Sequence, residues 1–334
     1  MNILGIETSC DETSAAVVAV TKKSWKIKSN IVASQIKIHR AYGGVVPEVA
    51  ARNHIRKLIP VIDTALHTAQ CTWKNIDRIA VTTGPGLISS LNIGVEAAKT
   101  LALTTKKPIV AVNHVQAHAY AAWLTNTPIR FPALALIVSG GHTELVHITS
   151  TKKFKKIGQT LDDAAGESFD KVAKMLDLGY PGGPVVSKRA EQGNRCAFKF
   201  PRPMLTDDTL AFSFAGLKTS VLYTIQKLKK PISEKTVNDL CASFQQAVVD
   251  VLVGKTLRAV VAQKPKTVIL AGGVAANKAL RMALERALVN TPCAYVVPPF
   301  ALCTDNAAMI AAAGYFGTPI NPLRISANPN YEIS

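Results

Sequence analysis

The sequence predicts an α/β protein made of two related lobes, each opening with a strand, a polar turn and a second strand. The first such pattern covers residues 2–20, and the second covers residues 133–148, about 130 residues later. A chain of 334 residues with 48% hydrophobic content can bury a core large enough to divide in this way. We therefore expect an N-terminal lobe of residues 1–131 and a C-terminal lobe of residues 132–334.

The turn of the first pattern, residues 7–14, carries acidic, hydroxyl and thiol side chains that make poor packing material. Its hydroxyls and backbone N–H groups can hold a phosphate group. Asp11 and Glu12 can position a metal ion, a water molecule or an attacking amine, and they are our candidate catalytic residues. An ordinary hairpin turn uses the same residue types, so the pattern alone leaves both interpretations open.

The stretch from residue 33 to residue 66 is largely helical in pattern, with a break at residues 42–47. It mixes polar side chains with apolar neighbours, which is more typical of an interaction surface than of a catalytic centre. The polar residues in question are His39, Glu48, Arg52 and His54.

Two histidines, His114 and His118, stand four residues apart at the start of an alanine-rich stretch that favours helix. On a helix both imidazoles project from one face, which is a spacing that metal ligands use. The apolar run 108–112 predicts a buried strand just before His114, and ligands bind at strand ends in open α/β sheets. Two polar residues on an ordinary helix face are the alternative.

Asp305 occupies a comparable position far along the chain, after the apolar strand 294–297 and before the helical stretch 307–313. Its simplest role is to cap that helix. If the fold brings Asp305 to the histidine pair, two imidazoles and one carboxylate form a site for ferrous iron or zinc with open coordination positions.

The turn of the second pattern contains Ser139, Gly140 and Gly141, and its glycines let backbone amides approach an anion closely. Asp170 lies on a predicted helix, where it either accepts hydrogen bonds from ribose hydroxyls or faces solvent. The paired glycines before Asn277 let an adenine lie flat against the backbone, with Asn277 supplying hydrogen bonds. A nucleotide between the two lobes would be held by both turns.

A formal net charge of +17 favours a polyanionic partner, and nucleic acid is the first candidate. The lysines gather in three clusters without interleaved aromatic residues, so we expect contacts with phosphates rather than stacking on bases. Lysines that are merely solvated would give the same charge. The clusters are Lys22, Lys23, Lys26 and Lys28; Lys152, Lys153, Lys155 and Lys156; and Lys227, Lys229 and Lys230.

The sequence contains no apolar run long enough to cross a membrane and no secretion signal, so we expect a cytoplasmic protein without a membrane partner. Its six cysteines form no Cys-x-x-Cys pair, which is typical of free thiols in a reducing compartment.

These motifs together closely resemble the TsaD family, whose members are tRNA N6-adenosine threonylcarbamoyltransferases. The resemblance runs from residue 3 to about residue 317 and rests on long, specific motifs. The motifs are LGIETSCDET at 4–13, GGVVPE at 43–48, GPGL at 84–87, HVQAH at 114–118, VSGGHT at 138–143, GESFDK at 166–171, GGVAAN at 272–277 and DN at 305–306.

The resemblance implies the duplicated α/β fold of actin, sugar kinases and Hsp70, with mixed sheets flanked by helices. It implies transfer of a threonylcarbamoyl group from threonylcarbamoyl-AMP to N6 of adenosine 37 in tRNAs that read codons beginning with A. It implies one metal ion per subunit, Fe²⁺ or alternatively Zn²⁺, on His114, His118 and Asp305. The matching adenylate-binding positions are Ile137, Val138, Ser139, Gly140, Gly141, Asp170, Gly183 and Asn277.

The resemblance also implies two smaller partner proteins, a TsaB-type paralogue and a TsaE-type ATPase, with the stretch 33–66 as a docking surface. Two positions depart from the family pattern. Ala215 stands where members often have Ser, and Ser187 stands where many have Asp, so we do not count Ser187 as a site residue.

Three other functions fit parts of the sequence. A zinc peptidase would need a carboxylate between the two histidines, and Val115, Gln116 and Ala117 offer none. An ATP-hydrolysing kinase or chaperone of the same fold would not need the histidine pair. A non-enzymatic tRNA-binding scaffold would keep its function when His114 is replaced.

Overall fold

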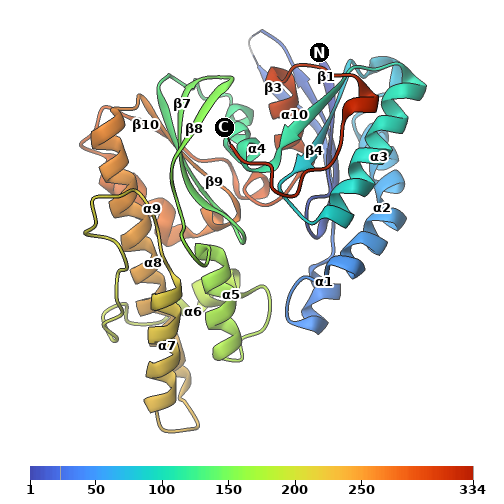
Figure 1. Cartoon of the computed structure of the whole chain (residues 1–334). Helices are drawn as coiled ribbons and strands as arrows, with labels where there is room; N and C mark the ends of the chain where they lie inside the picture. Colours follow the sequence, from blue (N-terminus) through green and yellow to red (C-terminus); the bar gives the residue numbers. More distant parts are fainter. Residues whose placement is uncertain (23, 334) are drawn as a thin grey trace. The chain divides into compact units, whose positions relative to one another are not determined.

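A computed structural model describes residues 1–22 and 24–333 and divides the chain into two units, each with its own five-stranded sheet (Figure 1). Unit 1 consists of Met1–Ile129, Ser150–Phe154 and Pro298–Ser334, and unit 2 consists of Arg130–Thr149 and Lys155–Val297. Lys23, a member of the first lysine cluster, lies outside the described residues.

The division differs from the predicted one in its C-terminal part. The predicted boundary near residue 131 lies close to the observed change of unit at Ile129, but Pro298–Ser334 belongs to unit 1 and not to the second lobe. The reason is that helix α10 (Ala307–Phe316) packs on the sheet of unit 1. Gly5 in that sheet lies so close to the helix that a Cβ would stand 2.1 Å from the carbonyl oxygen of Ala307.

The sheet of unit 1 has the strand order β3-β2-β1-β4-β5. Strand β1 pairs antiparallel with β2 and parallel with β4, while the outer pairs are antiparallel β2–β3 and parallel β4–β5. Successive side chains of β1 alternate between the two faces, so that Leu4 and Ile6 join the core under α2 and α3 while Ile3 and Gly5 face α10. The strands are β1 Asn2–Glu7, β2 Glu12–Val20, β3 Trp25–Ser34, β4 Arg78–Gly84 and β5 Ile109–Asn113.

Helices α2 and α3 cover one face of this sheet and α10 covers the other (Figure 1). The stretch predicted to be helical from residue 33 begins as the end of strand β3, and its long helix starts only at Pro47, where the fixed φ of proline suits the first turn. The α-helices are α1 Ile36–His39, α2 Pro47–Thr68, α3 Ile88–Thr105, α4 His114–Tyr120 and α10 Ala307–Phe316. Short 3₁₀ helices span Arg40–Tyr42, Trp73–Asn75, Ala121–Thr125, Phe300–Leu302 and Pro322–Arg324.

The sheet of unit 2 has the order β10-β9-β6-β7-β8. Strand β6 pairs antiparallel with β7 and parallel with β9, and β9 pairs parallel with β10. Read from β8, the strands follow the order third, second, first, fourth and fifth, which is the order found in unit 1. The repeated pattern in the sequence therefore marks a duplicated sheet. The strands are β6 Ala133–Val138, β7 Thr143–Ser150, β8 Lys153–Gln159, β9 Thr267–Ala271 and β10 Ala294–Val296.

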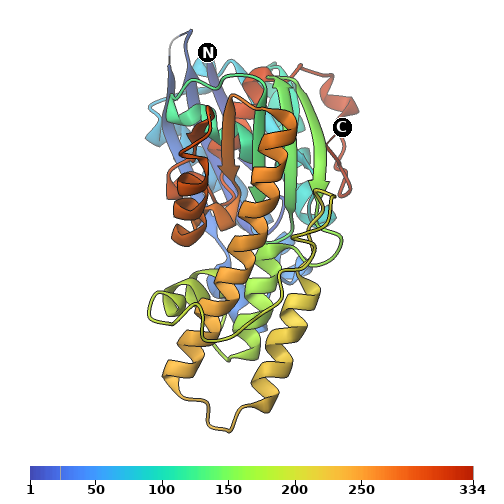
Figure 2. The ribbon, with the colours of Figure 1, turned by 90° about the vertical axis from the view of Figure 1, so that its left-hand side faces the viewer.

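The helices of unit 2 include the longest of the described chain, α8, which starts after the N-cap Ser233. Figure 2 shows α7 and α8 as an antiparallel pair joined by the turn 228–233. Inside the unit, the rings of Phe169 and Phe244 meet edge to face with centroids 5.0 Å apart. The helices are α5 Ala165–Met175, α6 Gly182–Ala190, α7 Ala215–Lys227, α8 Glu234–Gln263 and α9 Lys278–Leu288, with a 3₁₀ turn at Gly273–Ala276.

Two of the predicted lysine clusters lie on outer strands of the sheets. Lys26 and Lys28 belong to β3, and Lys153 and Lys155 belong to β8. Charged side chains on an outer strand discourage pairing with the edge of another molecule. Edge protection therefore accounts for the position of these lysines whether or not they also bind phosphates. Among the described residues, no helix is both long and apolar enough to cross a membrane.

Candidate metal centre and active-site turn

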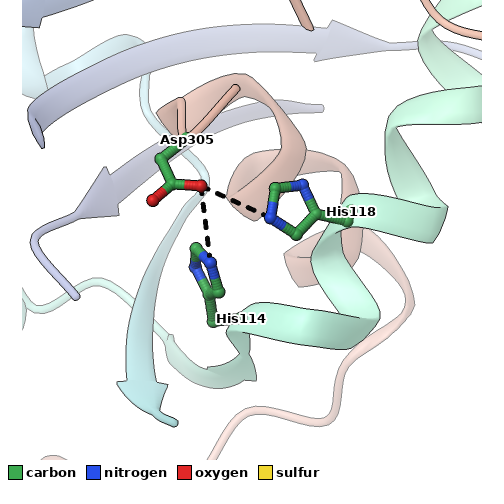
Figure 3. Close-up of side chains that lie close together, drawn as sticks. All are labelled: His114, His118 and Asp305. Carbon is green, nitrogen blue, oxygen red and sulfur yellow. Dashed lines mark ion pairs between the residues drawn. The ribbon is translucent and has the colours of Figure 1, made fainter. Parts of the chain in front are cut away.

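His114, His118 and Asp305 come together within unit 1, as the sequence predicted (Figure 3). Helix α4 starts directly at the end of β5, because the side chain of Asn113 accepts a hydrogen bond from the backbone N–H of Gln116 at 3.0 Å. Both histidines are therefore displayed at a strand end. Asp305 stands two residues before α10, which returns to the same sheet. Its Oδ1 lies 3.5 Å from Nε2 of His114 and 3.4 Å from Nε2 of His118.

This group can bind a metal ion. Ligand atoms at about 2.1 Å from a tetrahedral ion stand about 3.4 Å apart, which is close to the two observed separations. One ligand atom from each residue lies within 4.8 Å of the others. Both histidines are buried, and Nδ1 of His118 has no hydrogen-bond partner among the described residues, while its Nε2 faces Oδ1 of Asp305. Two buried imidazoles that each turn one nitrogen toward the same carboxylate oxygen form a donor set that fits a metal.

Glu7, at the end of β1, orients the ring of His114 from the side opposite Asp305. Its Oε2 lies 3.0 Å from Nδ1 of His114 and also accepts the hydroxyl hydrogen of Thr82 at 2.7 Å. Its Oε1 accepts the backbone N–H of Ser9 at 2.5 Å. A carboxylate that accepts a hydrogen bond from Nδ1–H of an imidazole keeps the ring proton on Nδ1, which leaves the Nε2 lone pair for a metal. Glu7 is not among the residues that the sequence predicted for this site.

The ionisable side chains of this group shift one another's pKa values. Although burial opposes it, Asp305 and Glu7 raise the pKa of His114 to about 9, so that without a metal ion Nε2 also carries a proton, which a bound ion would displace. Burial also works against an ionised Glu7, but the neighbouring His114 keeps the pKa of Glu7 below its ordinary value. Burial lowers the pKa of His118, so this ring stays neutral and available as a ligand.

The acidic turn between β1 and β2 lies beside the metal group. Gly86 packs so tightly against it that a Cβ would stand 2.5 Å from the carbonyl oxygen of Ser9. Burial raises the pKa of Asp11 and raises that of Glu12 to about 7. Oε1 of Glu12 accepts the hydroxyl hydrogen of Ser34 at 2.8 Å, while its buried Oε2 has no partner among the described residues.

Two histidines that were predicted to lie on an interaction surface are buried instead, and His54 lies against this turn. His39 and His54 have no exposed surface, whereas Glu48 and Arg52 are exposed as predicted. Nε2 of His54 lies 2.9 Å from the carbonyl oxygen of Cys10, so it carries the proton and donates. The prediction was wrong for the two histidines because the helical pattern did not reveal which side of each helix faces the sheet.

The second predicted site lies in unit 2, at the turn between β6 and β7. The turn is closed by a hydrogen bond from the backbone N–H of Ser139 to the carbonyl of His142 at 2.8 Å. A Cβ added to Gly140, Gly141 or Gly183 would meet nothing within 4 Å, so their backbone is open to a ligand. Gly166 is needed for a different reason, because a Cβ there would stand 2.5 Å from the carbonyl oxygen of Ser139.

The remaining predicted adenylate contacts have structural roles in unit 2. Ile137 and Val138 are fully buried within β6, so their side chains are not accessible to a ligand. Oδ1 of Asp170 accepts the backbone N–H of Gly182 at the start of α6, at 2.7 Å. Asn277 caps α9 through its Oδ1, and its Nδ2 donates to Ser187 at 2.9 Å and to Gln245 at 2.7 Å.

Comparison with known sequences gives a consistent result. The family model described as "TsaD: tRNA N6-adenosine threonylcarbamoyltransferase" matches residues 26–312. A protein of Thermosipho melanesiensis named tRNA N6-adenosine threonylcarbamoyltransferase is 50% identical over 336 residues, covering 100% of this chain and 100% of the relative. A protein of Bacillus subtilis with the same name is 52% identical over 315 residues, covering 94% of this chain and 90% of the relative.

Comparison with solved structures confirms the predicted fold class. HypF from T. kodakarensis superposes with a TM-score of 0.60 at 13% identity, covering 94% of this chain and 46% of HypF. The activator of the 2-hydroxyisocaproyl-CoA dehydratase from Clostridium difficile, with bound ADPNP, gives a TM-score of 0.52 at 14% identity and 94% coverage of both chains. At such low identity these likenesses describe the fold alone, a duplicated α/β architecture with mixed sheets.

Proposed function

Because the chain belongs to the family of tRNA N6-adenosine threonylcarbamoyltransferases, we propose that it attaches a threonylcarbamoyl group to N6 of an adenosine in tRNA. The acceptor is adenosine 37 in tRNAs that read codons beginning with A, and the donor is threonylcarbamoyl-AMP. A tRNA substrate agrees with a cytoplasmic location. The observation that carries the proposal is the group formed by the buried His114 and His118 with the half-buried Asp305 beside the acidic turn.

In this proposal His114, His118 and Asp305 hold one metal ion, Fe²⁺ in preference and Zn²⁺ as the alternative. Two imidazoles and one carboxylate leave coordination positions open, and both metals accept such ligands. A metal ion held there would act as a Lewis acid and polarise the carbonyl of the donor. Glu7 fixes the ring of His114, and the cap on α4 fixes the direction of both histidines.

The exocyclic amine of adenosine is a weak nucleophile, so a nearby proton acceptor assists the transfer. Asp11 and Glu12 are the candidates. Burial raises the pKa of Glu12 to about 7, which leaves much of it protonated at neutral pH. The pKa of Asp11 is also raised by burial but starts from the lower value of 3.8. We therefore assign proton acceptance to Asp11 and a supporting role to Glu12.

The adenylate part of the donor is assigned to unit 2. The open backbone at Gly140, Gly141 and Gly183 suits a phosphate and a ribose, and amides in the turn after Ser139 can stabilise charge on departing AMP. Asp170 orders the start of α6 and presents its carboxylate there. Ile137, Val138 and Asn277 then support the site from behind, since their groups are buried or already hydrogen-bonded within the unit.

For the tRNA we propose contacts with the lysines of β8 and of the turn between α7 and α8. For the TsaB-type partner we propose docking on α2. Ile55 and Ile59 stand one helical turn apart on this helix and are 66% and 58% exposed, beside the exposed Arg56. Adjacent exposed apolar side chains on a helix suit a protein interface. The TsaE-type ATPase completes the proposed set of partners.

The proposal is tested by incubating the purified protein with labelled threonine, ATP, unmodified tRNA and an enzyme that makes threonylcarbamoyl-AMP, with and without the TsaB-type and TsaE-type partners. Mass spectrometry of the nucleosides measures threonylcarbamoyladenosine. We expect product with wild type. With His118→Ala we expect the rate of product formation to fall at least about a hundredfold, because a site that loses one of its three protein ligands binds the metal much more weakly.

The matched control is His67→Ala, which changes an exposed histidine at the end of α2. No product under any combination of partners, with metal content verified, would refute the transferase function. Turnover of ATP alone by the purified chain would then favour a kinase-like or chaperone-like ATPase. tRNA binding without turnover would favour a scaffold.

A further inference from the structure

The segment between β3 and α2 carries an exposed tyrosine for which the proposed reaction gives no role. We propose that Tyr42 stacks on an unpaired base of the tRNA, while Lys37 and Arg40 contact phosphates of the same strand. This inference rests on the proposed transferase function, and it names the part of unit 1 that binds the RNA strand next to the acceptor adenosine.

This segment starts at the acidic turn. The backbone N–H of Gln35 donates to the carbonyl oxygen of Asp11 at 3.2 Å, and the hydroxyl of Ser34 donates to Oε1 of Glu12 at 2.8 Å. Helix α1 and the 3₁₀ helix that ends at Tyr42 follow directly. With a rise of about 1.5 Å per α-helical residue and about 2.0 Å per 3₁₀ residue, the backbone of Tyr42 lies within about 12 Å of Gln35. Neighbouring nucleotides of one strand can span this distance.

The segment is fixed on its inner side. Gln35 and His39 are buried, and the backbone N–H of Gly44 donates to the carbonyl oxygen of His39 at 3.3 Å. The backbone N–H of Val46 donates to Nδ1 of the His39 ring at 3.3 Å. Tyr42, in contrast, is 61% exposed. Because the backbone around Tyr42 is already held by these bonds, its ring loses little conformational freedom when it binds a partner.

The exposed residues of this segment have the chemistry of a contact with single-stranded RNA. Lys37 and Arg40 are exposed as well as Tyr42. Faces of aromatic rings bind unpaired bases, and cations bind phosphates. A Cβ added to Gly43 or Gly44 would meet nothing within 4 Å, so the backbone that follows Tyr42 leaves room for a nucleotide to approach closely.

The charges determine which part of a nucleotide faces the acidic turn. The carboxylates of Asp11 and Glu12 repel phosphates and accept hydrogen bonds from amines. A strand whose phosphates lie on Lys37 and Arg40 therefore presents the exocyclic amine of a neighbouring adenine to the turn. A protein that docked here would have to bury both cations, whereas RNA neutralises them, so the charges favour RNA as the occupant.

Binding of a short RNA hairpin tests the proposal without turnover. The hairpin carries the acceptor adenosine in its unpaired loop, and its dissociation constant is measured by fluorescence anisotropy with the full chain and no donor. We expect Tyr42→Leu to weaken binding about five- to a hundredfold, which is the range for loss of one base–aromatic stack. The matched variant Tyr42→Phe keeps the ring and should bind as wild type does.

A duplex RNA of the same length separates stacking from unspecific attraction. Because a duplex offers no unpaired base, Tyr42→Leu should bind it as wild type does. Arg40→Gln should reduce the slope of log K against log salt for the hairpin by about 0.7. The control Lys74→Gln, which changes an exposed lysine of the 3₁₀ helix Trp73–Asn75, should leave this slope unchanged. Equal losses on hairpin and duplex, or equal losses in Tyr42→Leu and Tyr42→Phe, would overturn the proposal.

Three further results have distinct meanings. Unchanged hairpin binding by Tyr42→Leu together with weaker binding of the TsaB-type partner would indicate a protein interface and overturn the proposal. Failure of the wild-type protein to bind the hairpin, alone and with that partner, would also overturn it. If the Tyr42→Leu loss is found in a protein that makes no threonylcarbamoyladenosine, the RNA contact stands and the transferase function is refuted, so the two failures are distinguishable.

Discussion

Replacing Glu7 with Gln changes one atom type in the metal centre and should reverse the tautomer of His114. The two carboxylate oxygens of Glu7 accept three hydrogens, from Ser9, Thr82 and His114. A Gln side chain keeps only one oxygen. The backbone N–H of Ser9 can only donate and lies at 2.5 Å, so it takes that oxygen and the amide nitrogen turns toward His114.

An amide N–H pointing at Nδ1 makes this nitrogen an acceptor. When His114 is neutral, as a metal ligand must be, its single ring proton then lies on Nε2, the atom that faces Asp305 at 3.5 Å and would otherwise bind the metal. Metal binding must first reverse this arrangement. Loss of such an outer partner lowers metal affinity about 10- to 100-fold, which corresponds to about 1.4–2.7 kcal/mol. Thr82 does not prevent the change, because its hydroxyl can accept as well as donate.

The assay is competition for Zn²⁺ between the protein and a chromogenic chelator, with Zn²⁺ chosen because it does not change oxidation state. Glu96→Gln is the matched control, since the side chain of Glu96 is 64% exposed on α3 and pairs only with Lys99 among the described residues. We expect weaker binding in Glu7→Gln at unchanged stoichiometry and unchanged circular dichroism. Equal affinity in Glu7→Gln and wild type would refute the orienting role of Glu7.

Two further predictions concern the acidic turn and the lysines. Folding raises the pKa of Glu12 from 4.5 to about 7. Its contribution to the free energy of unfolding is therefore fully present below pH 4.5 and is lost as the pH rises through 7. The loss is at most about 3 kcal/mol, because this group is partly exposed. Urea unfolding at pH 5 and pH 8 should show a smaller pH effect in Glu12→Gln, and parallel shifts in both proteins would contradict this. Lys153→Glu with Lys155→Glu keeps the edge of β8 charged but should weaken tRNA binding and reduce the salt slope by about 0.9 for each lost phosphate contact. An unchanged slope would place the tRNA elsewhere.

Within the metal group, the histidine pair was predictable because its geometry depends on a local rule. The spacing of His114 and His118 fixes their common face on any helix. Asp305 was linked to them only by the family resemblance, because the strand before it, β10, belongs to the sheet of unit 2 and α10 returns Asp305 to unit 1. Glu7 was not predictable in the same way, since it pairs with His114 across 107 residues of sequence. Only the pairing of β1 with β4, and of β4 with β5, places these two residues near each other.

The missed strands have a physical explanation as well. Strands β3 and β8 are outer strands, and their lysines were interpreted only as charge clusters. In β3, Lys26 and Lys28 in fact alternate with Trp25 and Ile27, which is the pattern of a half-exposed strand, whereas the adjacent Lys155 and Lys156 break the alternation in β8. The burial of His39 and His54 was missed for a related reason. A helical pattern shows that one face is apolar, but a polar residue on that face becomes meaningful only when its partner is known, which is the carbonyl of Cys10 for His54 and the backbone N–H of Val46 for His39.

The return of α10 to unit 1 affects how the protein is made. The strands of unit 1 leave the ribosome first, yet the face of the sheet that carries Gly5 stays uncovered until α10 has been synthesised. Unit 2 is almost continuous in sequence and can complete its core earlier. Since Asp305 emerges only with this last segment, an incomplete chain lacks one of the three ligands. The group of three side chains is therefore complete only after Asp305 has been synthesised.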